Sequence, residues 1–204
     1  MKRIDCLTAA ARFISNQLVV TNNGGATVEW ASVGPAESHL QVKTLGLCSS
    51  IGLGLALAVP SRTVVVFDGD GSLLMNLSTL PTIARQQPPN FVHVVFDNGV
   101  YEASGGTPTQ TAEGRAGADL AGLARAAGIA SVQVATTAEA FTEQLRSALA
   151  SPGPHFIHAR VEPGRAKVPP MAVDEVENKY RLIRHIERSQ GISILTRPRP
   201  ASQR

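Results

Sequence analysis

The sequence has few cysteines and few aromatic residues, and it lacks long hydrophobic runs. Of its 204 residues only two are cysteines, Cys6 and Cys48, which lie far apart and outside any paired spacing. This pattern argues against a zinc site and against a disulfide-stabilised secreted scaffold, so we expect both thiols to be small core groups. No apolar run approaches the roughly 20 residues that a membrane-spanning helix needs, and the charged start MKRIDCLTAAARFIS is typical of an amphipathic helix rather than a signal peptide. We therefore expect a cytoplasmic protein without a membrane partner.

The sequence also has little excess of one sign of charge, because its 19 lysines and arginines nearly balance its 16 acidic residues and the formal net charge is only +3. Nine of the 19 lysines and arginines follow Gly164, which gives the chain a basic C-terminal part. A basic tail is compatible with nucleic-acid binding, but no aromatic residues are interleaved with these charges and no known nucleic-acid module is present. We expect no nucleic-acid partner.

Strand-length apolar runs alternate with helical patterns along the chain. Strands are predicted at 17–21, 63–67, 91–96, 131–134 and 155–161, and helices at 46–59, 77–86, 119–128 and 137–150. This rhythm predicts an α/β fold in three layers, α/β/α, with a mostly parallel sheet.

The chain is predicted to divide into one domain, residues 1–165, and a C-terminal extension, residues 166–204. The extension should contain a helix over about 173–188, with a partly apolar stripe along one side. The stripe consists of Val173, Val176, Tyr180, Ile183 and Glu187. The last residues, 196–204, are expected to be disordered.

The stretch VVVFDGDGS, residues 64–72, places two aspartates at the end of an apolar strand. In open α/β sheets, ligands bind beyond the carboxyl ends of such strands, so Asp68 and Asp70 lie where a site is expected. The adjacent glycines let the backbone approach a ligand, and Ser72 is predicted to begin a helix. A helix start favours anions, whereas carboxylates favour a hard cation. The stretch therefore predicts a combined metal and phosphate site.

A second polar pair, Asp97 and Asn98, ends the next strand, FVHVVF. Asn98 lies 28 positions after Asp70, which is enough for one right-handed crossover helix, so the two strand ends should be neighbours. Carboxylate, amide and backbone carbonyl oxygens are ligands suited to Mg²⁺ or Ca²⁺ carrying a diphosphate. The simpler alternative is that Asn98 and Gly99 only form a turn.

An alternative interpretation of the aspartates is a phosphatase of the haloacid dehalogenase type. In that family a strand ends in Asp-x-Asp-Gly-Ser/Thr, and Asp68 would be the nucleophile and Asp70 the acid/base. That chemistry also needs a downstream lysine and a later acidic cluster. After Asp70 the only lysines are Lys167 and Lys179, and no paired aspartates follow a strand.

GDGS followed after about 26 residues by an asparagine at a strand end resembles the cofactor motif of thiamine diphosphate-dependent decarboxylases. More narrowly, VVVFDGDGSLLMNLSTLPTIA and VVFDNGVYEASGGTPT are similar to beta subunits of sulfopyruvate decarboxylases and to phosphonopyruvate decarboxylases. The resemblance runs from about Leu18 to Tyr180 and includes TNNGGATVEW and LGLCSSIGLGLALA. It implies the thiamine diphosphate-binding fold over residues 1–165.

The resemblance also implies residue roles. Asp70, the Asn98 side chain and the Val100 carbonyl would bind the metal, Mg²⁺ or Ca²⁺. Leu45, just before Gly46, would be the apolar wedge that bends the cofactor. The remaining cofactor contacts would come from Gly25, Ala26, Thr27, Gly46, Gly71, Ser72, Asn98 and Tyr101.

Two positions depart from the family pattern. Ala26 stands where the family usually has a threonine, so one polar contact to the diphosphate is lost or made by the backbone. Thr107 stands where a glutamine is common, in the segment from Glu102 to Thr109 that is expected to cover the cofactor.

Other patterns have structural explanations. GLGLALA lacks a preceding strand and a third glycine, so a packed helix explains it better than a dinucleotide site. The histidines share no metal-ligand spacing, and His93, His155 and His158 lie in predicted strands, where satisfied structural histidines are expected.

The family uses a glutamate on a separate pyrimidine-binding domain to activate the cofactor. Glu29, Glu37 and Glu102 stand in no matching context, and residues 1–17 leave no room for such a domain before the first strand. The resemblance therefore implies a hetero-oligomer in which a pyrimidine-binding (alpha) subunit supplies the glutamate. The implied reaction is decarboxylation of a small anionic 2-oxo acid, 3-sulfopyruvate or, as the closest rival, 3-phosphonopyruvate. A noncatalytic binding subunit that retains the fold is the other alternative.

Overall fold

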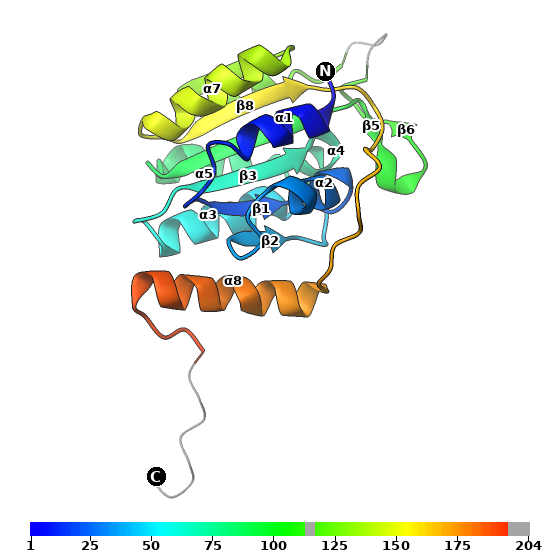
Figure 1. The fold of residues 1–204 in the computed structure, drawn as a ribbon. Coiled ribbons are helices and arrows are strands. Elements are labelled where there is room, and N and C mark those ends of the chain that lie inside the picture. The colour runs from blue at the N-terminus through cyan, green and yellow to red at the C-terminus, as the bar shows by residue number, and fades with distance from the viewer. Residues whose placement is uncertain (113–116, 196–204) are drawn as a thin grey trace, which may run out of the picture.

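The computed structural model describes residues 1–112 and 117–195, which form a parallel sheet with helices on both faces (Figure 1). The six strands lie in the order β2-β1-β3-β4-β8-β7, and every neighbouring pair is parallel. In chain order they are β1 (Leu18–Thr21), β2 (His39–Gln41), β3 (Val64–Gly69), β4 (Phe91–Asp97), β7 (Ser131–Ala135) and β8 (His155–Arg160). The predicted α/β fold with a mostly parallel sheet is confirmed.

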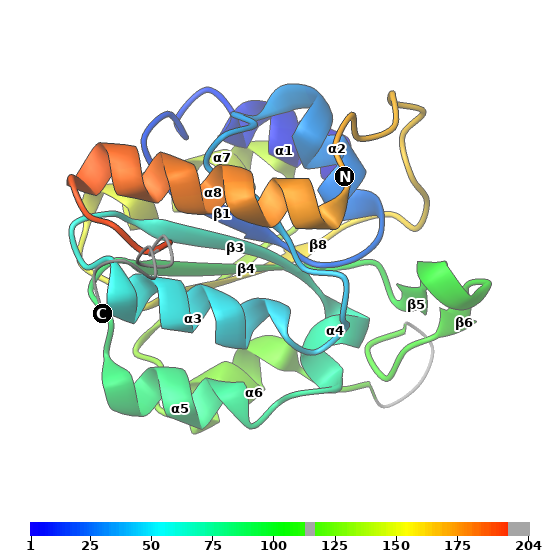
Figure 2. The same cartoon turned by 90° about the horizontal axis from the view of Figure 1, so that it is seen from below.

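Helices cover both faces of this sheet, which is why its central strands are buried almost throughout. Helices α1, α2 and α7 lie on one face of the sheet, and α3, α5 and α6 lie on the other (Figure 2). Buried residues of α8 belong to the same core cluster as those of α3, α5 and α6. The helices are α1 (Arg3–Ala10), α2 (Gly25–Val33), α3 (Cys48–Ala58), α4 (Asp70–Leu74), α5 (Thr79–Gln86), α6 (Leu120–Ala126), α7 (Ala138–Ala150) and α8 (Glu175–Gln190). None of the helices in the described ranges is long and apolar enough to cross a membrane.

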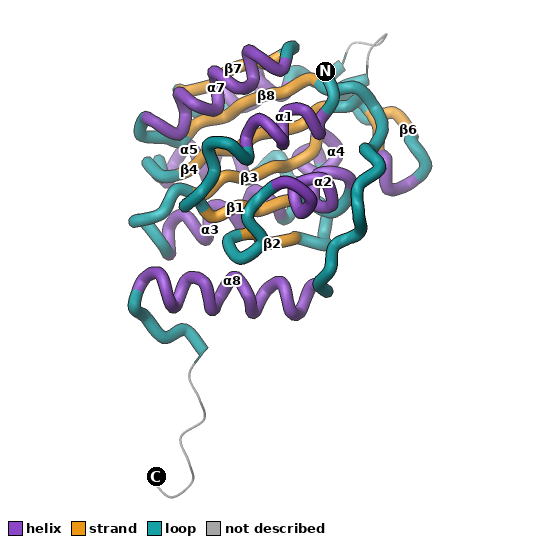
Figure 3. Tube along the Cα trace, viewed as in Figure 1, coloured by secondary structure: helices purple, strands orange, loops and turns teal. Residues whose placement is uncertain are grey.

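A small antiparallel pair, β5 (Val100–Tyr101) and β6 (Thr107–Pro108), projects beyond the carboxyl end of β4 (Figure 3). Between the two strands lies a short 3₁₀-helix, η1 (Glu102–Ser104). The segment from β8 to α8 crosses the same edge of the sheet, so several loops gather where the strands end (Figure 1).

The predicted strands and helices agree with the observed ones to within one or two residues, with two exceptions. The first is the helix expected from Ser72 onward, which is two helices, α4 and α5. A continuous helix would leave the Leu77 carbonyl without a partner, because Pro81 has no N–H. The side chain of Asn76 stabilises the break by donating to the Gly46 carbonyl at 2.8 Å and to Ser50 Oγ at 3.0 Å.

The second exception is the apolar stripe predicted on the C-terminal helix, which was wrong. Val176 and Tyr180 are 61% and 45% exposed, whereas the buried residues of α8 are Asn178, Leu182 and Ile186. The inward face is set by a polar residue, because Asn178 lies against the open edge of β2. There its amide donates to the His39 carbonyl at 2.9 Å and accepts from the Gln41 amide at 2.8 Å.

Helix α8 therefore continues the core of the sheet domain on its β2 side. The boundary between residues 165 and 166 stays a prediction, and the disorder predicted for residues 196–204 falls outside the described residues. Cys6 and Cys48 are buried free thiols, as predicted. Gly52 of the GLGLALA helix lies against Val66, where a Cβ would come within 2.2 Å of a valine methyl group, so this glycine serves packing.

Candidate functional site

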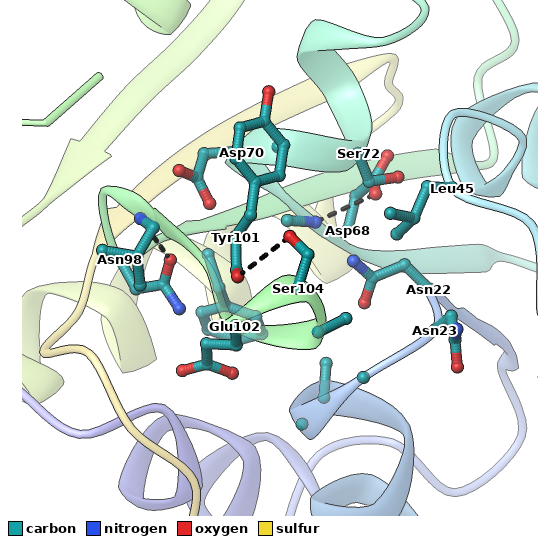
Figure 4. A pocket seen from close by; sticks show the side chains of 18 of the residues that line it. Asn22, Asn23, Leu45, Asp68, Asp70, Ser72, Asn98, Tyr101, Glu102 and Ser104 are labelled. Carbon is teal, nitrogen blue, oxygen red and sulfur yellow. Dashed lines mark hydrogen bonds between the residues drawn. The ribbon is translucent and has the colours of Figure 1, made fainter. Parts of the chain in front are cut away.

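The candidate site is a cavity of about 250 Å³ at the carboxyl ends of β3 and β4 (Figure 4). The two strands are adjacent and parallel, with Gly69 paired to Phe96, so the residues that follow them emerge at the same edge. The predicted site residues that line the cavity are Gly25, Ala26, Leu45, Asp70, Gly71, Ser72, Asn98, Val100 and Tyr101. The structure thus brings together residues from four separate stretches of the chain.

Asp70 begins α4 and is only 3% exposed. One of its carboxylate oxygens, Oδ2, accepts hydrogen bonds from the hydroxyls of Thr109 and Thr111, at 2.6 and 3.1 Å. Burial raises the pKa of Asp70 above its ordinary value despite these bonds, and the nearby charge of Asp97 raises it further. The hydrogen bonds therefore do not fully offset the cost of burying the ionised carboxylate. A cation bound next to Asp70 would offset the rest of that cost.

Asp97, at the end of β4, has a different environment. Its Oδ2 lies 2.7 Å from His158 Nε2, and its Oδ1 accepts from Thr111 at 2.6 Å. Burial acts to raise the pKa of this carboxyl, but the His158 and Thr111 contacts outweigh it, and the pKa of Asp97 is lowered. The Thr111 hydroxyl has one proton, which it can donate to Asp97 or to Asp70 but not fully to both. A change in the protonation of one carboxylate therefore changes the hydrogen bonding of the other.

Asn98 both forms the predicted turn and faces the cavity. Its Oδ1 accepts from the Val100 amide at 3.1 Å, and Gly99 adopts a positive φ of 69°. The turn returns the chain so that Val100 and Asn98 line the same cavity as Asp70. The two interpretations of this Asn-Gly pair are therefore compatible.

The donors at this end of the cavity fit a hard divalent cation. Among the residues that the structure describes, no three histidines, cysteines or acidic residues cluster in a way that could hold a metal. A metal would instead be bound by the carboxylate of Asp70, the side-chain amide oxygen of Asn98 and the Val100 carbonyl. These are oxygen ligands of the kind that Mg²⁺ and Ca²⁺ prefer, and a neighbouring cation would stabilise the ionised form of the buried Asp70 carboxylate.

The start of α2 forms a second wall. Gly24 precedes the helix with a φ of 121°, a conformation that only glycine adopts without strain, and Gly25 and Ala26 follow as its first residues. Their amide groups have no partners within the helix, as in any first helical turn, and both residues line the cavity. This is the arrangement expected for contacts to an anion.

Two predicted cofactor contacts, Thr27 and Gly46, are not among the residues that line the cavity. The Thr27 hydroxyl is buried, donates to the Asn22 carbonyl and lies 2.7 Å from Thr21 Oγ1. The Gly46 amide donates to Ser72 Oγ at 3.1 Å, which leaves the hydroxyl proton of Ser72 free for another acceptor. Direct cofactor contacts from Thr27 and Gly46 remain predictions.

Leu45 and Tyr101 supply the apolar parts of the site. The Tyr101 ring lies so close to Gly71 that a Cβ there would come within 2.5 Å of it, so Gly71 must remain a glycine for the tyrosine to pack. Leu45 projects toward the same cavity from the loop between β2 and α3 (Figure 4).

Several residues that line the cavity are not among the predicted cofactor or metal contacts, most clearly Arg3, Asn22, Asp68 and Glu102. The end of the apolar strand predicts that Asp68 lies near a site, but the only role predicted for it is that of a phosphatase nucleophile. It is 1% exposed, and its Oδ2 has no hydrogen-bond partner but lies 3.4 Å from His93 Nε2. Both His93 ring nitrogens also lack hydrogen-bond partners, so the expectation of a satisfied histidine was wrong there. It was right for His155, which contacts Ser131 and Ser151, and for His158.

Arg3 reaches the cavity from the N-terminal helix and is 6% exposed. Its Nε donates to Glu29 Oε2 at 2.8 Å, while its Nη2 lies 3.3 Å from Glu29 Oε1 and 3.3 Å from Glu102 Oε2. Burial acts to lower the pKa of Arg3, but the two carboxylates more than offset it and the pKa is raised, so the guanidinium stays charged. No feature of the sequence near Arg3 indicates this role, which arises from the packing of α1 on α2.

The chain is similar to proteins of known function over most of its length. Residues 25–159 match the family model described as "Thiamine pyrophosphate enzyme, C-terminal TPP binding domain". The chain is 36% identical over 170 residues to a phosphonopyruvate decarboxylase of Streptomyces viridochromogenes, and the match covers 80% of the chain and 41% of that protein. It is 35% identical over 187 residues to the sulfopyruvate decarboxylase subunit beta of Methanothermobacter thermautotrophicus, with 91% and 96% covered.

Among solved structures, the fold is similar to a thiamine diphosphate-dependent 4-hydroxybenzoylformate decarboxylase of Rhodococcus jostii. The TM-score is 0.68 at 24% identity, and the match covers 81% of this chain and 33% of that one. The chain thus spans about two fifths of the phosphonopyruvate decarboxylase, one third of the solved enzyme, and nearly all of the beta subunit. These likenesses set the phosphatase interpretation aside.

Proposed function

Because this chain belongs to the family of thiamine pyrophosphate enzymes, whose C-terminal cofactor-binding domain it contains, we propose that it is the cofactor-binding (beta) subunit of a 2-oxo acid decarboxylase. The proposed reaction converts 3-sulfopyruvate to sulfoacetaldehyde and CO₂. The proposed assembly is a hetero-oligomer with a separate pyrimidine-binding (alpha) subunit.

One observation carries the proposal: Asp70, Asn98 and Val100 line one cavity with the first turns of α2 and α4. A divalent ion bound by the first three, Mg²⁺ or Ca²⁺, would neutralise a diphosphate whose outer oxygens accept from the amides of Gly25, Ala26, Gly71 and Ser72. When bound, thiamine diphosphate supplies the nucleophile and the electron sink that loss of CO₂ requires.

The residues of this chain would then have four tasks. The Ser72 hydroxyl, which accepts from the Gly46 amide, would donate a hydrogen bond to the diphosphate. Leu45, which lines the cavity, would hold the cofactor in its bent form, and Tyr101, which packs on Gly71, would shield the metal side from water. The Thr109 and Thr111 hydroxyls orient the Asp70 carboxylate.

The coverage of relatives supports a two-chain arrangement. The match takes in 96% and 98% of two proteins named sulfopyruvate decarboxylase subunit beta but 41% of a phosphonopyruvate decarboxylase. Glu29 does not replace the activating glutamate, because it is 1% exposed and paired with Arg3, and Glu102 is paired with Arg3 and the Gly164 amide. We therefore assign that glutamate to the partner.

3-Phosphonopyruvate is the second candidate substrate, because two phosphonopyruvate decarboxylases are 36% and 37% identical to this chain. A noncatalytic subunit is a weaker alternative. Ala26 and Thr107 depart from the family pattern, but every predicted metal ligand is present at the cavity.

The test is to purify the chain with its native partner and to measure CO₂ release with thiamine diphosphate and Mg²⁺. We expect turnover of 3-sulfopyruvate, slower turnover of 3-phosphonopyruvate, and none with either subunit alone. Preference for the phosphonate would replace the first substrate by the second. Cofactor binding by the assembly without turnover of any 2-oxo acid would favour the noncatalytic alternative.

A further inference from the structure

The cavity has one positively charged side chain. Of the described residues that line it, Arg3 alone is a lysine, arginine or histidine, whereas Asp68, Asp70 and Glu102 are acidic. A substrate with a second acidic group needs a cation or several N–H donors for that group, because an unpaired charge is costly to bury. Arg3 is therefore the group of this chain that can meet it.

Buried contacts with Glu29, on the side away from the cavity, fix the orientation of the Arg3 guanidinium. Glu29 is 1% exposed, receives two hydrogen bonds from the guanidinium and a third from the Ala166 amide at 2.8 Å. The guanidinium also lies against Gly25, where a Cβ would come within 1.9 Å of Nη2. Arg3 and Glu29 together are electrically neutral. Nη2 also donates to the Gly164 carbonyl at 3.2 Å, and its contact with Glu102 is the one on the cavity side.

The chain's own Glu102 now occupies the position in front of Nη2. One oxygen of its carboxylate lies 3.3 Å from Arg3 Nη2, and the other accepts from the Gly164 amide at 2.9 Å. A guanidinium together with a backbone N–H is a typical pair of donors for an oxyanion. Glu102 is 23% exposed, unlike the buried Arg3 and Glu29.

We propose that Arg3 and the Gly164 amide form a subsite for the acidic substituent of the substrate, a sulfonate, phosphonate or carboxylate, and that Glu102 is its internal stand-in. This inference rests on the proposed function and names the residues that recognise the substrate. Exchange of the Glu102 carboxylate for a singly charged sulfonate or carboxylate preserves the charge of the cluster. Glu102 can leave because η1 is one short turn, followed by exposed Gly105 and Gly106, both at positive φ.

The alternative is that the contact of Glu102 with Arg3 only holds η1 against the N-terminal helix. The two explanations differ in the effect of Glu102→Gln. As a competitor for the anion, Glu102 lowers the affinity of the subsite, so its neutralisation should tighten anion binding. As a purely structural contact, Glu102 would have no such effect.

The first experiment is an NMR titration of the full chain with sulfoacetate, following the Gly164 backbone amide. We expect a saturable shift in the wild type and about tenfold tighter binding in Glu102→Gln, since a competing charge-assisted contact is removed. The double variant Arg3→Met/Glu29→Gln, which removes both buried charges together, should show no saturable shift. Equal binding in all three proteins would overturn the proposal, and so would a saturable response to pyrophosphate with Mg²⁺ but none to sulfoacetate.

The second experiment separates this inference from the proposed function. In the assembled enzyme, Arg3→Met/Glu29→Gln should reduce the ratio of kcat/KM for 3-sulfopyruvate to that for pyruvate, which lacks the second acidic group. An unchanged ratio would refute the subsite while leaving the decarboxylase assignment intact. If the double variant does not fold, Glu102→Gln alone decides, because it should increase the same ratio. A wild-type assembly that decarboxylates nothing refutes the proposed function, and the sulfoacetate titration still tests the subsite.

Discussion

Asp70 is a buried carboxylate whose neighbours do not fully compensate its charge. Two threonine hydroxyls donate to it, yet burial and Asp97 keep its pKa raised. Such a carboxylate lowers the stability of the folded protein but can bind a cation, and groups with perturbed pKa values are common at functional sites.

Replacement of Asp70 by Asn should therefore separate binding from stability. We expect the affinity for thiamine diphosphate with Mg²⁺ to fall by about 100-fold or more, which corresponds to roughly 3 kcal/mol. The urea midpoint should stay the same or rise, because a destabilised charge is removed. Isothermal titration calorimetry and urea denaturation measure the two effects, and Glu139→Gln, an exposed carboxylate on α7, is the control. Loss of stability without loss of affinity would contradict this role of Asp70.

Leu45 is predicted to act on the geometry of the cofactor rather than on its affinity. Leu45→Ala should lower kcat of the assembled enzyme by about 10- to 100-fold, the effect expected when reacting groups are misplaced. The dissociation constant of the cofactor should change much less. Leu47→Ala changes a 43% exposed leucine of the same loop and is the matched control. Equal effects of the two substitutions would argue against a wedge.

Some residues of the site could be predicted from the sequence and others could not. Asp70 and Asn98 follow two successive apolar strands, so their meeting at one sheet edge could be predicted from the topology alone. Arg3 and Glu102 could not, because they reach the cavity through the packing of α1 and through a hairpin that no periodic pattern predicts.

At the level of elements, one side chain takes the hydrogen-bonding place of a neighbouring strand at the β2 edge of the sheet. Asn178 of α8 satisfies both a carbonyl and an amide of β2. This explains why the buried face of α8 could not be predicted from hydrophobic periodicity: its first inward residue is polar.

Asn178→Ala should destabilise the fold by about 2 to 3 kcal/mol, because it leaves two buried backbone groups without partners. The measurement is the free energy of unfolding from urea titration. Lys179→Ala, at the exposed neighbouring position, should change it by less than about 0.5 kcal/mol. Similar values for both variants would show that the edge of β2 does not depend on Asn178.

His39 in β2 makes the same edge sensitive to pH. Burial lowers its pKa to about 4, and the charge of Arg181 contributes. Between an unfolded-state pKa near 6.5 and this value, the unfolded chain binds the proton and the folded chain does not, so stability falls as pH decreases.

The loss attributable to His39 should reach on the order of 3 kcal/mol by pH 4. Urea titrations at several pH values from 7 to 4 measure it, with His39→Gln for comparison. The variant should show a flatter dependence over this range. Parallel curves for the two proteins would rule out His39 as the titrating group.

At the level of the whole molecule, the cavity lies at the edge of the domain where all the parallel strands end. The alternation of apolar strands and helices was enough to predict this architecture. The sequence could not show that α8 would be part of the same core, since its packing depends on a side chain-to-backbone contact rather than on an apolar stripe.

One consequence concerns the assembly. If the proposed alpha subunit supplies part of the cofactor site, the isolated chain should bind thiamine diphosphate with Mg²⁺ at least about tenfold more weakly than the complex of the two. Calorimetry on both preparations measures the difference. Equal affinities would mean that the partner contributes nothing to the cofactor site.

The central claim is that Asp70, Asn98 and the Val100 carbonyl bind one divalent ion that holds the cofactor's diphosphate. Crystals of the assembly grown with thiamine diphosphate and Mn²⁺, in place of Mg²⁺, would locate the ion by its anomalous signal. We expect one manganese peak with all three oxygens within about 2.6 Å, the range of oxygen ligands to hard cations. A peak that touches neither Asn98 nor Val100, or a diphosphate bound away from the peak, would contradict this metal site.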